Sequence, residues 1–429
     1  MSEPLQKLMI NRRHALGLGA VIGAGTLAAC GGSPGENGAP TSTGGAAGSV
    51  EFTSWIFGSD TAGPKLRAIG EDFTARTGIE VKDSAYPYLQ YLDQVVLKAR
   101  SGSISGIAHI DEEWMSTLVT AGALKEIPAS VSMDPYPENV ASTGLFDGTR
   151  YGVPWTHSAL GLVANSELLA AAGVTEHPTT IDGFTEMLRA LKRADSSLVP
   201  YCPATSVQQL KDMVPWMWAF GSPIVQDATV TLGDEGSLAA IDYWKMLLDE
   251  GLIQAGMVRD DMRTLFAQGK VAVYDDAPQA IGIIPGQSSD PDIAGKMVPF
   301  SRPGKDGPGD TLLWSQPLVA FATGEAELEL MQFLSTDDGA LRAAFEMNGQ
   351  PPATIEGTQA DWFTSNEFYK AWNEQVTPRS RRNPFWDFPS ASAAQTVFNE
   401  QVEAALAGSG SAAAALAAAA DELQGMLAK

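Results

Sequence analysis

Acidic side chains directly follow two apolar runs of the kind that form buried strands. The five residues concerned are Asp111, Glu112, Glu113, Asp275 and Asp276. Carboxylates at strand ends can accept hydrogen bonds from the hydroxyl groups of a ligand, and a bond to a charged group contributes about 1.5–3 kcal/mol. Acidic residues also stabilise helix N-termini, so Asp111 could instead cap the helix that contains Trp114. We expect a ligand contact from one of the first three, with Asp111 preferred, and leave both roles open for the other two.

Tryptophans are the second kind of candidate contact. The chain has ten, and several stand beside polar residues at predicted strand ends. An indole can lie flat on the apolar face of a polyhydroxylated ring while carboxylates, amides and guanidinium groups bond its hydroxyl rim. The alternative for each indole is a place in the protein core. The candidates are Trp55, Trp114, Trp155, Trp218, Trp314 and Trp386.

Two arginines and a histidine extend this set. Arg381 and Arg382 precede the sequence Asn-Pro-Phe-Trp, and a guanidinium fork there could grip vicinal hydroxyl groups or an anion. The plain alternative is a pair of surface arginines in a loop. His157 stands two residues after Trp155, and we interpret it as a hydrogen-bonding wall of a site rather than a catalytic base.

Motifs of metal-dependent or nucleophilic catalysis are missing from the sequence. There is no HExxH, no CxxC pair, and no phosphate loop or nucleophile elbow between a predicted strand and helix. The two cysteines, Cys30 and Cys202, are not expected to form a disulfide, and Cys202 is expected to be a small buried apolar residue. We therefore expect no metal, no cofactor and no enzymatic activity.

The charge balance excludes some partners. The 429 residues carry 28 Lys and Arg against 51 Asp and Glu, a net charge of −23. Nucleic-acid binding depends largely on cationic contacts to phosphate, so nucleic acid is not an expected partner. No apolar run reaches the roughly 18 residues that a membrane-spanning helix needs.

The N-terminal residues follow the pattern of export signals. Arg12 and Arg13 precede a short apolar stretch, residues 15–29, which predicts a twin-arginine signal peptide over residues 1–29. Residues 27–30 read Leu-Ala-Ala-Cys, which resembles the lipobox of bacterial lipoproteins. Cys30 would carry the lipid, and two acyl chains are enough for stable anchoring. Residues 30–49 are then a flexible tether that spans roughly 25 Å.

Strand-like and helix-like segments alternate after the tether. Residues 50–55 alternate like a strand, a helical stretch ends before Gly78, and residues 79–81 begin the next strand. The same alternation continues along the chain, and residues 395–429 predict helices interrupted near Gly408. This order predicts an α/β fold with mainly parallel sheets.

Several phrases in this order resemble the extracellular solute-binding proteins of ABC importers, in particular the sugar-binding, maltose-binding-protein-like family. The resemblance covers nearly all of residues 50–429. Its most specific pieces are residues 73–81, 91–101, 110–114, 121–124, 146–155 (Phe-Asp-Gly-Thr-Arg-Tyr-Gly-Val-Pro-Trp) and 265–273. The chain departs from the family at residues 275–279, which read Asp-Asp-Ala-Pro-Gln where Gly-Pro-Trp is frequent. This departure leaves the identity of the ligand open.

The resemblance implies a two-lobed periplasmic-binding-protein fold of type II. Each lobe is a mainly parallel sheet flanked by helices, is discontinuous in sequence and closes on a ligand by a hinge motion. We expect lobe 1 from residues 50–155 and 277–322, and lobe 2 from residues 156–276 and 323–429. The chain would cross between the lobes near residues 154–156, 275–278 and 321–323.

The resemblance also implies a role. A lipid-anchored protein, exported to the cell surface or the periplasmic side of the cytoplasmic membrane, would capture a mono- or oligosaccharide and deliver it to an ABC permease. We expect a monomer. The residues predicted to bind the ligand are Trp55, Asp111, Glu112, Trp155, His157, Trp218, Asp275, Asp276, Trp314, Ser315, Arg382 and Trp386.

Two alternatives remain open at this stage. The cargo could be a glycerophosphodiester or a polyol, with Arg381 or Arg382 meeting the anion of the former. A secreted glycoside hydrolase would instead use a carboxylate pair such as Asp111 and Asp276, at a separation that the sequence does not reveal.

Overall fold

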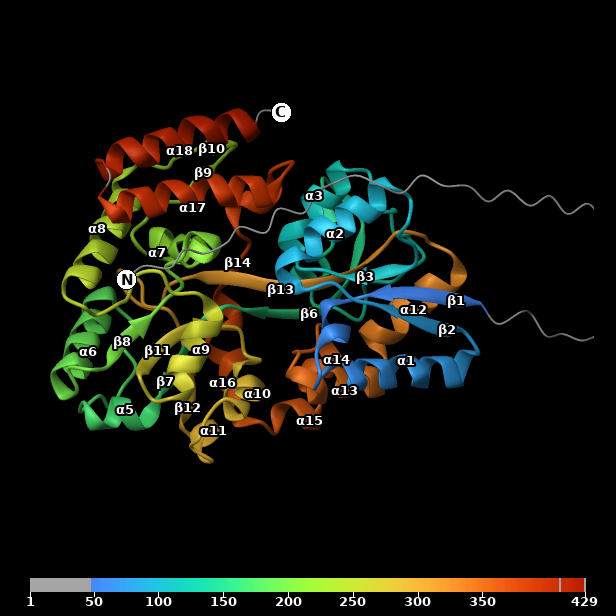
Figure 1. The fold of residues 1–429 in the computed structure, drawn as a ribbon, viewed down its shortest axis with the longest axis horizontal. Coiled ribbons are helices and arrows are strands. Elements are labelled where there is room, and N and C mark those ends of the chain that lie inside the picture. Colours follow the sequence, from blue (N-terminus) through green and yellow to red (C-terminus); the bar gives the residue numbers. More distant parts are fainter. Residues whose placement is uncertain (1–47, 409, 428–429) are drawn as a thin grey trace, which may run out of the picture. The chain divides into compact units, whose positions relative to one another are not determined.

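The computed structural model describes residues 48–408 and 410–427. The predicted signal peptide, the predicted lipidation site Cys30 and the predicted tether up to residue 47 lie outside these residues. The described body has two lobes, each built on its own sheet, and two long strands run between them (Figure 1). The α/β fold class predicted from the sequence is confirmed.

Lobe 1 is built on a six-stranded sheet in the order β14-β13-β3-β1-β2, with β6 paired to β13. Its strands are β1 (Ser49–Thr53), β2 (Glu80–Ser84), β3 (Ile107–His109), β6 (Gly152–Ala159), β13 (Thr311–Ala320) and β14 (Ser380–Arg381). β1 pairs with β2 and β3 in parallel, and β13 pairs antiparallel with both β3 and β6. The carboxyl ends of β1 and β3 therefore lie at the same edge of the sheet, next to β6 and β13.

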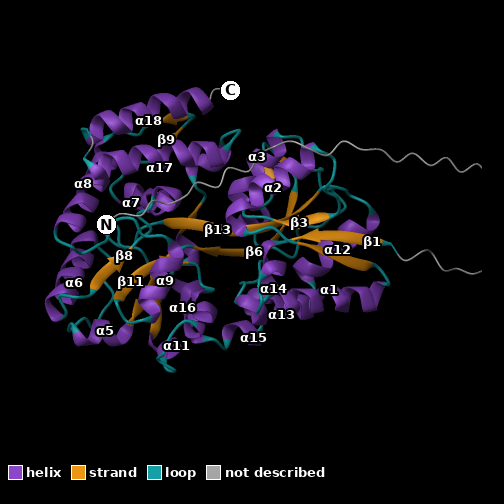
Figure 2. Ribbon diagram, viewed as in Figure 1, coloured by secondary structure: helices purple, strands orange, loops and turns teal. Residues whose placement is uncertain are grey.

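Helices cover both faces of this sheet (Figure 2). One face packs against α1 (Gly63–Thr77), α12 (Glu325–Thr336) and α13 (Asp338–Asn348). The other packs against α2 (Tyr88–Arg100) and α3 (Met115–Thr120). Alternation along β3 explains the two cores, because Ile107 enters the first and Ala108 the second.

Lobe 2 is built on a four-stranded sheet in the order β12-β7-β11-β8. Its strands are β12 (Met297–Phe300), β7 (Gly161–Asn165), β11 (Val271–Asp276) and β8 (Val199–Cys202). Only β11 and β8 pair in parallel, since β7 runs antiparallel to both β11 and β12. The main helices of this lobe are α5 (Ser166–Ala171), α6 (Ile181–Ala194), α7 (Met213–Ala219), α8 (Glu235–Asp249), α9 (Arg259–Ala267), α16 (Glu367–Gln375), α17 (Ala391–Ala407) and α18 (Ala412–Leu427).

Short elements complete the body. The remaining helices are α4 (Glu138–Ala141), α10 (Ala280–Ile283), α11 (Ile293–Lys296), α14 (Ile355–Gln359) and α15 (Asp361–Thr364), and the 3-10 turns are η1 (Trp55–Gly58), η2 (Glu112–Trp114), η3 (Val207–Asp212), η4 (Ile284–Gly286), η5 (Thr377–Arg379) and η6 (Pro384–Asp387). Two hairpins join β4 (Leu145–Phe146) to β5 (Thr149–Arg150) and β9 (Val225–Gln226) to β10 (Thr229–Val230).

Local sequence signals mark the ends of several of these helices. Helix α1 ends where Gly78 adopts a left-handed conformation (φ 78°) and donates its N–H to Thr74, as the glycine predicted. Helix α6 begins after Thr180, whose side chain caps it by accepting from the N–H of Gly183. The break between α17 and α18 also follows a left-handed glycine, Gly408.

The membership of two segments in the lobes differs from the expectation. Residues 277–300 were expected in lobe 1, but Ala277, Ile284 and Met297 are buried in the cores of lobe 2. Residues 325–348 were expected in lobe 2, but α12 and α13 pack on the lobe 1 sheet. The expected crossings near residues 275–278 and 321–323 are therefore wrong. Periodicity shows that a helix has an apolar face, but it does not show which core receives that face.

The strands β6 and β13 make the connection instead. They form an antiparallel ribbon whose paired residues run from Gly152 with Val319 to Ala159 with Leu313, and a bulge interrupts the register between Gln316 and Pro317. The first expected crossing, residues 154–156, lies within β6. The chain returns to lobe 2 after α13, since Trp372 of α16 is buried in a lobe 2 core.

Gly106, just before β3, offers a test of how tightly lobe 1 is packed. Its φ is +68°, and a Cβ there would lie 2.0 Å from the carbonyl oxygen of Glu51 in β1. Gly102 has a similar φ of +65° but no atom within 4 Å of its would-be Cβ. We expect Gly102→Ala to lower the free energy of unfolding by about 1–2 kcal/mol, the strain of a left-handed alanine.

Gly106→Ala carries the same strain and adds a backbone clash, so it should lower the free energy of unfolding by clearly more than the Gly102 variant. Urea denaturation followed by circular dichroism measures both. Equal losses for the two variants would show that β1 and β3 can separate freely at this point.

Candidate functional site

An aromatic cluster lies at the carboxyl ends of β1 and β3. The ring of Trp55 stacks on His109 with centroids 4.0 Å apart, and it meets Tyr88 and Trp114 edge-on at 5.3 and 5.6 Å. Trp55 is half-buried, whereas Tyr88 is 42% exposed. The cluster therefore presents aromatic surface at the edge of lobe 1.

A chain of hydrogen bonds passes through this cluster to Asp111. Gln316 donates from Nε2 to Asp111 Oδ1 at 2.8 Å, so its Oε1 faces His109 Nε2 at 3.0 Å. Burial lowers the pKa of His109 to about 3, so the ring is neutral. Its Nε2 therefore carries the proton, and Nδ1 accepts from the hydroxyl of Ser54 at 3.1 Å.

Asp111 is held by neutral groups. Tyr88 donates its hydroxyl to Oδ2 at 2.5 Å and Gln316 donates to Oδ1. Burial raises the pKa of Asp111 to about 6, and repulsion from Glu113 adds to the rise. Asp111 is 7% exposed, and its carboxyl group changes charge at a pH close to neutral.

The next two acidic residues meet cations of other segments. Glu112 is buried, accepts from the hydroxyl of Ser315 on β13 and forms an ion pair with Arg382 at 2.7 Å. Burial raises the pKa of Glu112 in spite of that guanidinium group. Glu113 forms an ion pair with Lys211 of lobe 2 at 3.0 Å.

Asp275 and Asp276, at the end of β11, were expected to reach a ligand. The structure instead gives both carboxylates protein partners. Asp275 is fully buried, forms an ion pair with Arg302 and accepts from the hydroxyl of Tyr201 at 2.5 Å. Asp276 accepts two bonds from Arg263 at 2.8 and 2.7 Å. Both carboxylates therefore hold the end of β11 in place through contacts within lobe 2.

The pKa values of this pair diverge for physical reasons. Burial raises the pKa of Asp275, with Asp212 adding repulsion, although Arg302 opposes the rise. Burial also opposes ionisation of Asp276, but the bidentate contact with Arg263 outweighs it and lowers the pKa. Asp212 itself pairs with Arg259 at 2.9 Å, so three Asp–Arg pairs lie side by side in lobe 2.

The other predicted tryptophans occupy different settings. Trp155 is 2% exposed and belongs to the core of lobe 1, and its ring meets that of His109 edge-on at 4.7 Å. Trp314 and Trp218 are partly buried against the main core of lobe 2. Trp386 packs on Leu313 and Ala391, and the guanidinium of Arg382 lies 5.3 Å from its ring centre.

His157 is the least satisfied of the predicted residues. It lies on β6 opposite Ser315 in the ribbon register, and it is 7% exposed. Within the described chain, neither of its ring nitrogens has a hydrogen-bond partner, and the same holds for the indole N–H groups of Trp218 and Trp386. Burial lowers the pKa of His157 to about 4, so its ring is neutral and can both donate and accept.

The site thus combines predicted and unpredicted residues. The structure brings Trp55, Asp111, Glu112, Ser315 and Arg382 to one boundary between the lobes. Four contributors escaped the sequence analysis: Tyr88, His109, Gln316 and Lys211. None of them directly follows a strand as the predicted acids do, and only the antiparallel pairing of β13 with β3 brings Gln316 to His109. For Tyr88, the signal available in the sequence was the pair Tyr86 and Tyr88 near the start of α2.

The described residues contain neither a cluster suited to a metal ion nor a helix suited to span a membrane. No group of three His, Cys, Asp or Glu side chains is arranged to hold a metal ion. No helix between residues 48 and 427, leaving aside residue 409, has the length and apolar character needed to cross a membrane.

Two lobes joined by a crossing ribbon, with aromatic and polar groups at their boundary, define a binding protein of the two-lobed class. The sequence profile of the bacterial extracellular solute-binding proteins matches residues 68–373. The chain belongs to this family.

Relatives and solved structures agree with this assignment. The diacetylchitobiose binding protein DasA of Streptomyces coelicolor is 22% identical over 259 residues, 58% of this chain and 60% of that protein. The GacH receptor of Streptomyces glaucescens, solved unliganded and with acarbose, is 19% identical with a TM-score of 0.79, covering 89% of this chain and 99% of its own. Maltose-bound MalE3 of T. maritima is 18% identical with a TM-score of 0.77, covering 88% and 99%. The two solved structures confirm the two-lobed fold.

The environment of Asp111 predicts a pH dependence of stability. Its pKa is higher in the folded protein than in the unfolded chain, so between about pH 4 and pH 6 the folded state binds more protons. The free energy of unfolding should therefore fall as the pH rises through this window, by roughly 2 kcal/mol for this group. Asp111→Asn should remove that component. Urea denaturation of both proteins across the window measures it, and parallel pH profiles would contradict it.

The buried pair of Arg302 and Asp275 predicts a non-additive effect. Arg302→Leu leaves a fully buried carboxylate without its cation, and breaking a buried pair in this way costs about 3–5 kcal/mol. The double variant Arg302→Leu, Asp275→Asn removes the unpaired charge and should recover part of that loss. Denaturation at pH 7 provides the comparison. A double variant that is less stable than the single variant would show that Asp275 does not depend on Arg302.

Proposed function

We propose that this chain is the substrate-binding protein of an ABC importer and that it captures a mono- or oligosaccharide between its two lobes. Membership of the extracellular solute-binding family supports the binding role. The names of the similar proteins support the cargo, since diacetylchitobiose, acarbose and maltose are all carbohydrates or carbohydrate analogues. In this role the protein delivers its cargo to a permease without chemical change.

The chemistry at the lobe boundary suits a neutral, hydroxyl-rich ligand. Trp55 and Tyr88 offer aromatic faces on which the C–H surface of a sugar ring can pack. Asp111 accepts from only two donors within the described chain, and a carboxylate has about four acceptor positions. It therefore retains capacity for hydroxyl groups of a ligand. The donors that bond it are neutral, and the nearby Lys211 is paired with Glu113, so no unpaired cation among the described residues favours an anion there.

His157 carries the proposal. The large majority of buried polar side-chain atoms in proteins have a hydrogen-bond partner, and an exception needs an explanation. Trp244 and Trp372 in lobe 2 also have unpartnered indole N–H groups, so a missing partner alone does not mark a site. The hydroxyl groups of Thr156 and Ser158, its neighbours on β6, are unpartnered too, so the unpartnered groups gather on the ribbon between the lobes. His157 differs from these neighbours by its place opposite a serine that bonds Glu112 and by having two unpartnered nitrogens. A hydroxyl group of a sugar would satisfy either of its ring nitrogens.

Export and anchoring are part of the proposal. The arginine pair at residues 12–13 and the small residues before Cys30 support secretion by the twin-arginine route and lipidation of Cys30. The protein would then be held on the outer side of the cytoplasmic membrane as a monomer beside its permease.

No observation favours the other two functions. Arg381 pairs with Asp310 and Arg382 with Glu112, so neither guanidinium is free for the anion of a phosphodiester. Asp276 is buried and both of its oxygens accept bonds from Arg263, so it is not placed to act on a glycosidic bond as the partner of Asp111.

A ligand panel tests the carbohydrate proposal. We expect maltose, maltotetraose, acarbose or diacetylchitobiose to raise the thermal unfolding midpoint and to change tryptophan fluorescence, with each ligand recovered unchanged. Glycerophosphocholine serves as the phosphodiester probe. A response to that probe alone, or flat signals across a wide panel of sugars and polyols, would contradict a carbohydrate cargo.

The sugar that responds best should then depend on His157. His157→Phe keeps an aromatic ring but removes both nitrogens, and the loss of one or two hydrogen bonds should weaken binding about 3- to 10-fold. His177→Phe is the matched control, because His177 packs on Phe300 in lobe 2 away from the ribbon. Isothermal titration calorimetry measures both affinities, and equal values would remove His157 from the site.

A further inference from the structure

Few contacts near the site join lobe 1 to lobe 2 directly. Glu113 in η2 and Lys211 in η3 form an ion pair at 3.0 Å, and their side chains are 24% and 26% exposed. Thr120 at the end of α3 donates its hydroxyl to the carbonyl of Pro389 at 2.7 Å, and Ser116 accepts from the N–H of Ala391 at 2.9 Å. These contacts are polar, and a change of separation between the lobes would break them.

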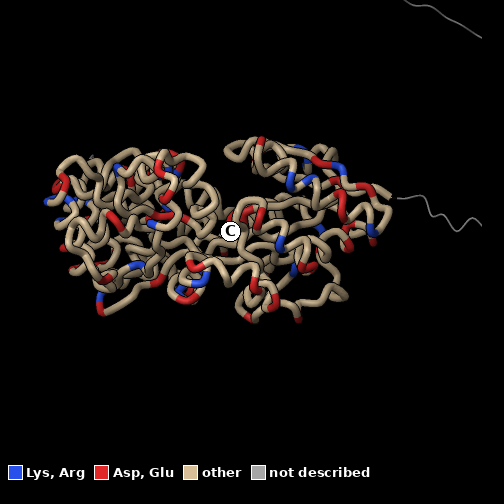
Figure 3. Tube along the Cα trace, turned by 90° about the horizontal axis from the view of Figure 1, so that it is seen from below, with Lys and Arg blue, Asp and Glu red and all other residues tan. Residues whose placement is uncertain are grey.

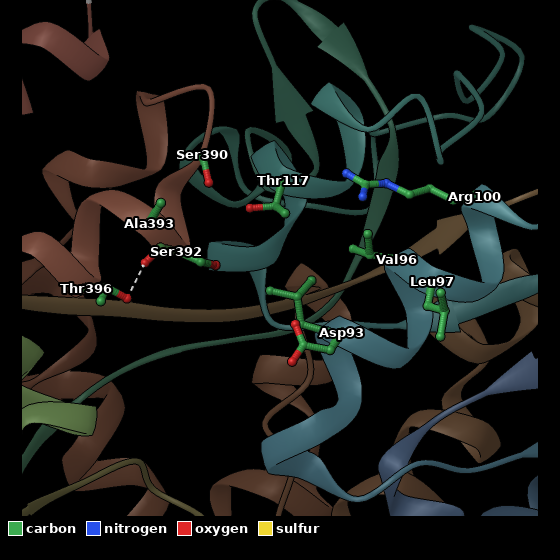
Figure 4. Close-up of a pocket in the computed structure, with 10 residues that line it drawn as sticks. Asp93, Val96, Leu97, Arg100, Thr117, Ser390, Ser392, Ala393 and Thr396 are labelled. Atoms are coloured by element: carbon green, nitrogen blue, oxygen red, sulfur yellow. Dashed lines mark hydrogen bonds between the residues drawn. The ribbon is translucent and has the colours of Figure 1, made fainter.

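A hollow of about 460 Å³ lies beside these contacts, between α2, α3 and the start of α17 (Figure 4). Residues of both lobes line it, with Val96 and Thr117 from one side and Ser390 and Ala393 from the other. The lobes therefore do not pack on each other through a continuous apolar interface here. Next to the hollow, polar contacts cross the boundary between the lobes.

The two ion pairs at this boundary differ in their attachment. Glu112 bonds Ser315 of β13, and its partner Arg382 directly follows β14, which pairs with β13. Both partners of that pair are thus fixed to the connecting ribbon and can stay together during a hinge motion. Glu113 belongs to lobe 1 and Lys211 to lobe 2, so a hinge motion that separates the lobes would also separate this pair.

The surroundings of Lys211 favour the charged pair. The carboxylates of Glu113 and Asp111 both act on it, and although burial opposes its charge, the pKa of Lys211 is raised overall. Lys and Arg residues and Asp and Glu residues occur all along the described chain (Figure 3). The partial burial of the pair of Glu113 and Lys211 also limits screening by salt at ordinary ionic strength.

We propose that Glu113 and Lys211 form an ionic latch that holds the two lobes together when no ligand is bound. The latch lies beside Asp111, so a ligand reaches that part of the boundary only after the pair opens. The free protein would then be divided between a closed, latched form and an open form that can bind. Apparent affinity for a ligand falls in proportion to the open fraction.

Distance measurements between the lobes test the latch without any ligand. Spin labels on Glu71→Cys in α1 and Asp242→Cys in α8, with Cys30→Ser and the buried Cys202 retained, report the separation by pulsed electron resonance. At about 0.1 M salt we expect a closed majority for the otherwise unchanged chain. Lys211→Met should raise the ratio of open to closed molecules about five- to tenfold.

Lys296→Met is the matched control. Lys296 also pairs with two carboxylates, Glu167 and Asp290, but all three residues belong to lobe 2. This variant should leave the distance distribution unchanged. Raising the salt to about 1 M should open the unchanged chain and have little further effect on the Lys211→Met variant, because the Debye length shrinks to about 3 Å.

A charge exchange distinguishes the latch from a folding effect. The double variant Glu113→Lys, Lys211→Glu should restore closure that each single substitution abolishes, while circular dichroism confirms the fold of all variants. The proposal is overturned if the unchanged chain shows only the long distance, or if Lys211→Met and Lys296→Met have equal effects. These outcomes are independent of which ligand the protein binds, so a failure of the carbohydrate proposal would leave them intact.

Discussion

The antiparallel pairing of β6 with β13 is the constraint on which the rest of the structure depends. The ribbon carries His157, Ser315 and Gln316, and the register places His157 opposite Ser315. Its two ends lie in different lobes, so the side chains on it lie between the two. The bulge between Gln316 and Pro317 changes the register within the ribbon, where a bulge can redirect a side chain. Gln316 there reaches both His109 and Asp111.

Acidic residues of the same type take three different roles according to their neighbours. Asp111 has neutral donors, so burial leaves its pKa near the physiological range. Glu113 meets a cation of the opposite lobe, so its contact depends on the separation of the lobes. Asp276 meets a cation of its own lobe and stays ionised whatever the lobes do. A sequence shows five acids after strands, but the charge that faces each one comes from the fold.

This difference sets the limit of what the sequence predicted. Local signals predicted α1, β2 and the break between α17 and α18, because capping glycines and periodicity act within a few positions along the chain. The lobe membership of α12 and α13 was wrong because their apolar faces fit either core. Trp155 was expected at the site because it ends the segment 146–155 that resembles the family. The alternation of side chains along β6 directs its ring into the core of lobe 1. Trp55 and Asp111 follow neighbouring strands, β1 and β3, whose parallel pairing brings both residues to one edge, and their contact with a ligand stays a prediction.

The direction of the hydrogen bonds argues for the kind of ligand that this edge can accept. The proton order runs from Ser54 through His109 and Gln316 to Asp111, and Tyr88 donates to the same carboxylate. Every group in the chain is neutral except its end, so the edge of lobe 1 presents one acceptor surrounded by aromatic rings. An anion would be repelled by that carboxylate, and a purely apolar ligand would leave its remaining acceptor positions unpaired at a cost of about 1–3 kcal/mol. A ligand with hydroxyl donors on its rim and C–H groups on its face meets both requirements at once.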